Sequence, residues 1–471
     1  MTSLADPPMV DDRDYRDPEL RLENLFDPGS LRPMSGRGTS GVMSARGTID
    51  GGAAIAFCTD ATKMGGAMGS DGCRHIVDAI DTAVRERLPI LGLWHSGGAR
   101  LAEGVEALDA VGLVFAAMVR ASGRVPQISI VLGPAAGGAA YGPALTDVVV
   151  MGPAGRVFVT GPDVVRRVTG EDVDAERLGG ADTQTRSGVV HLAERTDAAA
   201  VRRTRELLVL LGATGQVDLR RAAGPDPSAL VPSEHRLSYD VRPVVEAVLD
   251  LGTFVELQAG WARNAVVGLG RLAGRTVGVV ANQPQWLAGC LDAETGDKTG
   301  RFVQWCDSLG LPLIFLVDVP GYLPGVGQED GGVVRRGAKL LHAYAAAVVP
   351  RLTVVLRKSF GGAFIAMGSK GLGADVVFAW PGAQVDVMGA SAAIEVLHRR
   401  ELAAETDLVR RAELVVRLVA QHEATTGGLT RAVECGAVDE VLEPADTRRR
   451  LVEALAALPD HRRGDRANPP L

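Results

Sequence analysis

The chain contains one motif twice, and this duplication limits the possible fold more than any other feature of the sequence. The first copy is Gly133-Pro-Ala-Ala-Gly-Gly-Ala-Ala-Tyr-Gly142, and the second is Lys358-Ser-Phe-Gly-Gly-Ala-Phe-Ile365. Each copy follows a short β-branched run and precedes small residues that can start a helix. Glycine leaves backbone N–H groups unscreened, and a helix N-terminus directs such groups at an anion. The two copies therefore predict two sites that stabilise negative charge on an oxygen.

The repeat extends well beyond these glycines. Pro312 follows Pro89 by 223 positions, and Asp375 follows Asp147 by 228, so one unit occurs twice with small insertions. Strand-like and helix-like patterns alternate within each copy, which is typical of the α/β class.

A chain of 471 residues suits two or three domains, and the repeat favours two. The segment 222–228, which is rich in Pro, Gly and Ala, is the best candidate for a linker. We expect a flexible N-terminal tail at residues 1–18, a first domain at 19–230 and a second at 231–471.

Composition excludes several function classes. The net charge is −7 and aromatic residues make up only 4 %, so nucleic-acid binding is not expected. The five cysteines are scattered without a C-x-x-C pair, which indicates reduced thiols, no zinc site and a cytoplasmic protein. The uncharged segment 127–145 contains prolines and glycines, so we expect no membrane-spanning helix. We expect no metal in this chain.

Several local patterns suggest chemistry, with different strength. His95 and Ser96 are neighbours on an expected strand, so their side chains point to opposite faces and cannot form a catalytic dyad. The glycines at 65, 66 and 69 fit either a helix entry or a close backbone approach to a ligand. Glu103 and Glu106 are the nearest candidates for a base.

The chain resembles the β, or carboxyltransferase, subunits of biotin-dependent acyl-CoA carboxylases, most of all those of actinobacterial acetyl-/propionyl-CoA carboxylases. The resemblance spans about residues 20–450. Besides the two glycine motifs, it is carried by Trp94-His-Ser-Gly-Gly-Ala-Arg100, Asp318-Val-Pro-Gly-Tyr-Leu-Pro-Gly325, Arg335-Arg-Gly-Ala-Lys-Leu-Leu341 and the segment from Gly436 to Arg448. It implies two tandem crotonase-like ββα-superhelix domains, the first on the acyl-CoA side and the second on the biotin side.

The resemblance also implies roles for particular residues. The amides of Gly137 and Gly138 would hold the acyl-CoA thioester oxygen, and those of Gly362 and Ala363 the ureido oxygen of biotin. Further acyl-CoA contacts would come from Gly97, Gly98, Ala99, Arg100, Ala136 and Ala139. Gly361, Phe364 and Ile365 would contact biotin or set acyl specificity.

The activity implied is transfer of a carboxyl group from carboxybiotin to acetyl-CoA, and in addition to propionyl-CoA, for lipid synthesis. The products would be malonyl-CoA and methylmalonyl-CoA. No biotinylation site or ATP-binding motif is present in the sequence. The resemblance therefore implies a separate α subunit that carries biotin and the biotin carboxylase, and a homodimer or homohexamer of this chain.

One position departs from propionyl-preferring relatives, which commonly carry Asp where this chain has Ile365. The resemblance implies that Ile favours acetyl-CoA there. Three alternatives stay open: a subunit of a biotin-dependent acyl-CoA decarboxylase, a crotonase-type hydratase or isomerase, and a non-catalytic scaffold of a carboxylase complex.

Overall fold

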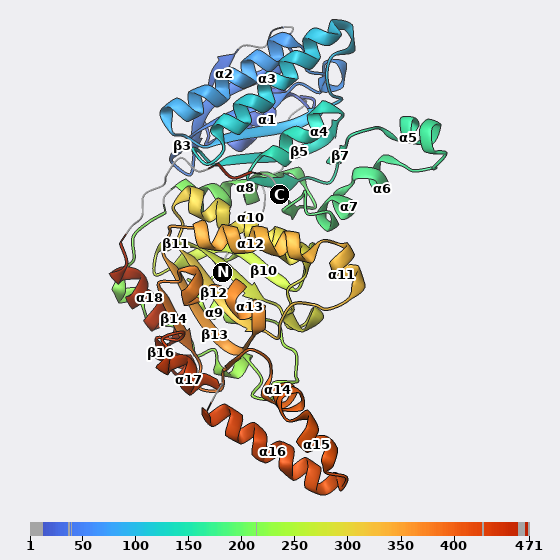
Figure 1. Ribbon diagram of the computed structural model, residues 1–471. Coiled ribbons are helices and arrows are strands. Elements are labelled where there is room, and N and C mark those ends of the chain that lie inside the picture. The colour runs from blue at the N-terminus through green and yellow to red at the C-terminus, as the bar shows by residue number, and fades with distance from the viewer. Residues whose placement is uncertain are drawn as a thin grey trace. The chain divides into compact units, whose positions relative to one another are not determined.

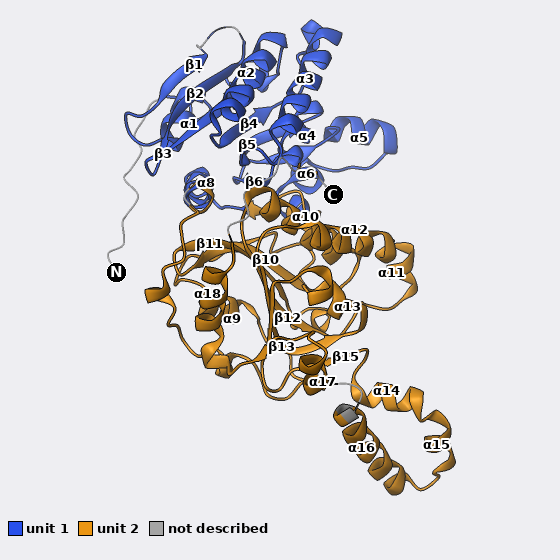
Figure 2. Ribbon diagram, turned by 60° about the vertical axis from the view of Figure 1, so that its left-hand side comes forward, with its two compact units in different colours: residues 1–184, 193–209 blue, residues 185–192, 210–471 orange. Residues whose placement is uncertain are grey.

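The computed structural model describes residues 13–35, 38, 40–212, 214–425, 428–459 and 467–469. It has two compact units, residues 1–184 with 193–209 and residues 185–192 with 210–471 (Figure 2). The expected tail at 1–18 lies largely outside the described residues. The expected domain limits of 19–230 and 231–471, with their acyl-CoA and biotin sides, stay predictions.

The first unit is built on one sheet with the strand order β1-β2-β3-β4-β5-β6-β8, and β7 pairs with β5 (Figure 1). Its strands are β1 (Arg32–Ser35), β2 (Val42–Ile49), β3 (Gly52–Thr59), β4 (Ile90–Ser96), β5 (Gln127–Ala136), β6 (Val148–Met151), β7 (Arg156–Phe158) and β8 (Leu192–Ala193). Its helices are α1 (Pro18–Leu25), α2 (Ser70–Glu86), α3 (Val105–Ala121), α4 (Gly138–Leu145), α5 (Pro162–Thr169), α6 (Ala175–Gly179), α7 (Ala181–Arg186) and α8 (Asp197–Gly212).

The second unit repeats this plan with the strand order β16-β14-β13-β12-β11-β10-β9, and β15 pairs with β13 (Figure 1). Its strands are β9 (Val255–Leu257), β10 (Ala265–Leu272), β11 (Arg275–Asn282), β12 (Leu313–Val319), β13 (Arg351–Phe360), β14 (Val376–Ala379), β15 (Gln384–Asp386) and β16 (Glu440–Val441). Its helices are α9 (Arg242–Val248), α10 (Ala293–Leu309), α11 (Val326–Asp330), α12 (Val333–Ala346), α13 (Gly361–Ala366), α14 (Ala390–Leu397), α15 (Arg399–Ala404), α16 (Leu408–Thr425), α17 (Gly428–Glu434) and α18 (Thr447–Ala457).

The strand registers of the two sheets repeat with the offsets read from the sequence. Ile55 pairs with Ile90 in parallel, as Gly278 pairs with Leu313, each 223 positions later. β5 and β6 are likewise parallel, as are β13 and β14. The α/β class and the internal duplication are therefore confirmed.

A half-buried carboxylate fixes the β-hairpin turn of the first unit. Asp27 accepts hydrogen bonds from the N–H groups of Asp50 and Gly51, each at 3.0 Å. Arg205 on α8 donates to Asp27 at 2.6 Å and to the carbonyl of Leu25 at 2.8 Å. One carboxylate thus caps the turn while one guanidinium ties it to two helices.

The second unit contains the same device. Asp250 accepts from the N–H groups of Ala273 and Gly274 at 3.0 and 2.9 Å. Arg448 donates to Asp250 and to the carbonyl of Val248, each at 2.6 Å. The Asp250 and Arg448 side chains are only 4 and 7 % exposed, so water competes little for this ion pair.

We predict that Asp250→Asn lowers the free energy of unfolding of the chain by about 3–5 kcal/mol, because it leaves the buried Arg448 guanidinium without its charge partner. Urea unfolding of the wild type and variant measures the difference. Asp81→Asn is the matched control, since Asp81 pairs with Arg120 on the surface, and its effect should stay within about 0.5 kcal/mol. Equal effects of the two substitutions would contradict the assignment.

Candidate functional site

The first glycine motif forms the turn between the central strand β5 and the short helix α4. Gly137 has a φ of 58°, which favours glycine, and it is the N-cap of α4. Its own N–H donates to the carbonyl of Phe158 on β7 at 3.2 Å. The next two amides, Gly138 and Ala139, donate to no other group in the described part of the chain, as expected for the first turn of a helix.

The second glycine motif forms the same turn between β13 and α13. Gly361 also has a φ of 58°, and Gly362 and Ala363 follow it in the first turn of α13. Their N–H groups likewise donate to no acceptor among the residues that the structure describes. Each unit therefore leaves a pair of adjacent backbone donors where a strand ends and a helix begins.

The two predicted pairs of backbone amides do not occupy equivalent positions in the two units. Gly138 corresponds to Gly362 and Ala139 to Ala363, each 224 positions apart, so the expected pair Gly137–Gly138 is not the counterpart of Gly362–Ala363. The reason is the pairing of β5 with β7, which uses the Gly137 N–H. In the described part of the first unit, the adjacent amides without an acceptor are those of Gly138 and Ala139.

The segment Gly97 to Arg100 lies directly against the first amide turn. A Cβ added at Gly98, whose φ is 102°, would lie 2.9 Å from the carbonyl oxygen of Ala136. Ala99 forms a parallel bridge with Met68, because the Met68 N–H donates to Gly98 and the Arg100 N–H donates to Met68. The structure thus brings this segment, Ala136 and the first amide turn together, as the sequence predicts. Their role in binding acyl-CoA stays a prediction.

The second unit has an aromatic side chain at the corresponding place. Tyr322 forms a bridge with Leu291, and its ring carbon Cε2 would lie 3.6 Å from a Cβ added at Gly362. Tyr322 therefore forms a wall of the second amide turn. It belongs to the motif Asp318–Gly325, but the sequence alone did not predict this role.

Two charged residues near the first turn hold structure together. Arg100 donates to Glu103 at 2.9 Å and to the carbonyl of Ser40 at 3.2 Å. Glu103 accepts from the N–H and hydroxyl of Ser70 at 2.7 and 3.0 Å, which caps the start of α2. These hydrogen bonds lower the pKa of Glu103, whereas a general base for hydration needs a raised pKa.

A buried ion pair positions the loops of the second unit. Arg357 donates to Asp318 at 2.8 Å, and their side chains are 4 and 1 % exposed. The same guanidinium donates to the carbonyls of Pro232, Glu234 and Leu237. Asp318 also accepts from the N–H of Lys358 at 3.2 Å, so it links the end of β12 to the strand that carries the second amide turn.

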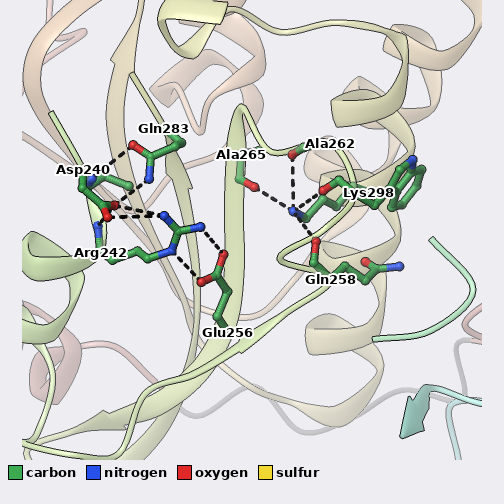
Figure 3. A network of polar contacts seen from close by, with 10 residues as sticks. Asp240, Arg242, Glu256, Gln258, Ala262, Ala265, Gln283 and Lys298 are labelled. Carbon is green, nitrogen blue, oxygen red and sulfur yellow. Dashed lines mark hydrogen bonds and ion pairs between the residues drawn. The ribbon is translucent and has the colours of Figure 1, made fainter. Parts of the chain in front are cut away.

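A buried lysine fixes the turn before β10. The Lys298 ammonium lies among four carbonyl oxygens, those of Gln258, Trp261, Ala262 and Ala265, at 2.7–3.3 Å (Figure 3). Burial lowers its pKa to about 7. A separate cluster of Asp240, Arg242, Glu256 and Gln283 lies beside it (Figure 3). The role of Lys298 is structural, because the four backbone carbonyls around it use all the donors of its ammonium group.

A pocket of about 500 Å³ borders the second amide turn. Gly361, Gly362, Phe364 and Ile365 line one side of it, and the other side comes from β15, the residues after it and α17. Ile365 is 47 % exposed, which makes it available to a ligand. The three residues predicted to contact biotin or set acyl specificity are therefore together at one pocket.

The described residues contain neither a metal-binding cluster nor a membrane-spanning helix. No group of three or more His, Cys, Asp or Glu side chains there is arranged to hold a metal ion. Within the same residues, every helix is too short or too polar to cross a membrane.

Comparisons with known proteins agree with this geometry. The model of the carboxyl transferase domain family matches residues 22–469. The chain is 57 % identical, over all of both chains, to the biotin-dependent acetyl-/propionyl-coenzyme A carboxylase beta6 subunit of Mycobacterium tuberculosis. It is 61 % identical to the propionyl-CoA carboxylase beta chain of Rhodococcus erythropolis, over 89 % of each chain.

A solved structure extends the likeness to the fold. Transcarboxylase 12S, with methylmalonyl-coenzyme A and methylmalonic acid bound and described as a hexamer, superposes with a TM-score of 0.88 at 39 % identity. The match covers 96 % of this chain and 92 % of that one. The crotonase-like fold expected from the sequence is thereby confirmed.

The His95 side chain lies between Gly133 and Arg21 and is neutral. Its ring packs where a Cβ of Gly133 would lie, 2.3 Å from Nδ1, and Nδ1 is 3.4 Å from the Arg21 guanidinium. Burial, and then the charge of Arg21, lower the pKa of His95 to about 4. Ser96 is buried and its hydroxyl accepts from the Gly98 N–H, so the two do not form a dyad.

We predict that His95 makes the chain less stable as the pH falls from 6.5 to about 4. Its pKa is lower in the folded chain than in the unfolded one, so over this window the unfolded chain binds a proton that the folded chain does not. Thermal melts across this range should show a shallower loss in His95→Asn than in the wild type. Parallel loss in both proteins would contradict a half-buried His95 that stays neutral in the folded chain.

Proposed function

The chain belongs to the carboxyl transferase domain family, and from this premise we propose that it is the carboxyltransferase subunit of an acyl-CoA carboxylase. It transfers the carboxyl group of carboxybiotin to acetyl-CoA, giving malonyl-CoA, and to propionyl-CoA, giving methylmalonyl-CoA. The observation that carries the proposal is the pair of equivalent turns at Gly138 and Gly362, each with two adjacent amides that donate to no acceptor among the described residues.

Each amide pair meets the oxygen of a different reactant. The first pair, Gly138 and Ala139, holds the thioester oxygen of the acyl-CoA, which becomes negative when the α-proton leaves. Two N–H groups at hydrogen-bond distance stabilise this enolate oxygen more than the neutral carbonyl, and this difference lowers the barrier. The Gly97 to Arg100 segment is held against this turn and lines the approach of the thioester.

The second pair, Gly362 and Ala363, holds the ureido oxygen of biotin. Bound carboxybiotin supplies CO2, and the chemistry of proton removal belongs to the ureido nitrogen rather than to a side chain of this subunit. The residues present fit that role, because the amide turn borders a largely apolar pocket and the Tyr322 ring lies against Gly362. The subunit orients both reactants and excludes water.

The partners follow from this division of labour. An α subunit with biotin carboxylase and biotin carrier activity supplies the carboxybiotin. Copies of this chain associate in the cytoplasm as a dimer or hexamer, and the first unit of one copy faces the second unit of another. Transcarboxylase 12S, which is described as a hexamer, supports the hexamer. The decarboxylase alternative has the same site and differs only in its partner. A hydratase would need a carboxyl group with a raised pKa as its base, whereas the pKa of Glu103 is lowered.

We predict that Gly362→Pro lowers kcat/KM for carboxyl transfer by about 10²–10³-fold, because proline removes one donor of the oxyanion site. Position 362 is in the first turn of α13, where the missing N–H costs no helical hydrogen bond. Steady-state transfer with the α subunit present measures the effect.

Gly362→Ala is its control. An added Cβ lies at an ordinary 3.6 Å from Tyr322, and the amide is kept, so activity should stay within about tenfold of the wild type. Similar losses in both variants would point to crowding rather than to a lost donor.

We predict that Ile365→Asp shifts preference from acetyl-CoA towards propionyl-CoA, since it changes a half-exposed wall of the pocket at the second amide turn. A change of one methylene in such a pocket is worth about 10–200-fold in relative kcat/KM. Rates with both acyl-CoAs, for the wild type, Ile365→Asp and the volume-conserving Ile365→Leu, give the ratio. An unchanged ratio in the Asp variant would show that Ile365 does not set the acyl preference.

A further inference from the structure

The first unit has a cavity of about 400 Å³ that plays no part in the proposed reaction. Arg21 and Asn24 of α1 line one side, and Asp197, Val201 and Arg202 of α8 line the other. Leu132 of β5 also lines it. We call it the α1–α8 cavity. Its size is within the range of small-molecule binding sites.

Two charged side chains that line this cavity each have one buried polar atom without a partner. Arg21 is 4 % exposed, and its Nη1 has no hydrogen-bond partner among the described residues. The buried Oδ1 of Asp197 has none either. The two side chains form no ion pair with each other within the described chain. Leaving such groups unsatisfied costs free energy, so they call for an occupant that both accepts from Arg21 and donates to Asp197.

The second unit shows what fills the same place there. Trp380 corresponds to Gly152, since the N–H of each donates to the matching residue of the central strand, Val355 or Val131. Trp380 is 5 % exposed and packs in a core with Val244 and Leu356, the counterparts of Arg21 and Leu132. At Gly152 an added Cβ would instead meet Asp197 Oδ1 at 2.6 Å.

The first unit has therefore exchanged an indole and an aliphatic side chain for a glycine, a guanidinium and a carboxylate. What remains is a space next to Leu132, in a position where the repeat accommodates a bicyclic aromatic ring. A guanidinium and a carboxylate are among the groups that line this space. A purine has that shape. Guanine presents the acceptors N7 and O6 to a guanidinium, and its N1–H and amino group donate to a carboxylate.

We propose that the α1–α8 cavity binds a purine base, with Arg21 donating to the ring acceptors and Asp197 accepting from the N–H groups. Arg202, which is exposed at the cavity, is placed to meet the phosphate of a nucleotide. Arg205 is not available for this, because Asp27, Asp50 and Leu25 occupy it. Burial raises the pKa of Asp197, as expected for a carboxylate without a partner.

The test is calorimetric titration of the full-length chain with guanosine 5′-monophosphate. Binding to the wild type should weaken by about tenfold or more in Arg21→Met and in Asp197→Asn, because each removes one side of the recognition. Asp197→Asn should at the same time gain affinity for xanthosine 5′-monophosphate, whose base carries a carbonyl in place of the amino group. This gain cannot come from a damaged fold.

Arg220→Met, an exposed substitution in the second unit, is the matched control and should bind like the wild type. Titration with coenzyme A gives the source of the base. If coenzyme A displaces the nucleotide, the cavity holds the adenine of the substrate, and if both bind together it holds a separate nucleotide. If no purine nucleotide binds at millimolar concentration, or if binding ignores both Arg21 and Asp197, the cavity holds water only and the proposal is overturned.

Discussion

The structure depends on one backbone constraint, the left-handed glycine that ends the central strand of each sheet. Gly137 and Gly361 share a φ of 58°, which allows the chain to leave a buried strand and start a helix within one residue. The helix that follows cannot use its first amides internally, so they stay available in a region otherwise filled by hydrogen-bonded strands. The proposed device for stabilising an oxyanion is thus a consequence of how the strand ends.

The rest of each unit keeps this turn in place. In the second unit the buried Arg357–Asp318 pair joins the end of β12 to β13, and the Leu291–Tyr322 bridge puts a ring against Gly362. In the first unit the neutral His95 occupies the place of the aspartate, next to Gly133. The same architecture therefore uses charge in one copy and packing in the other, which suits two sites that meet different reactants.

The spacing of Pro, Gly and Asp residues was enough to predict the duplicated α/β fold and to locate both turns, because strand ends and helix starts depend on local sequence. It was not enough to show that β7 uses the Gly137 N–H, since that contact joins residues 21 positions apart in sequence. The sequence also did not predict the ion pairs that Asp27 and Asp250 form at the two hairpin turns. Their arginines, Arg205 and Arg448, follow a longer offset than the strands do, so the repeat pattern does not align them.

The central claim is that main-chain amides, and not side chains, take up the charge of the reacting oxygens. Infrared difference spectroscopy of acetyl-CoA carrying ¹³C at the thioester carbonyl, bound to the full-length chain, tests it directly. The account predicts a carbonyl stretch at lower frequency than in water, and a return towards the value in water when Gly138→Pro removes one donor. A carbonyl frequency that is the same in water, in the wild type and in the variant would contradict it.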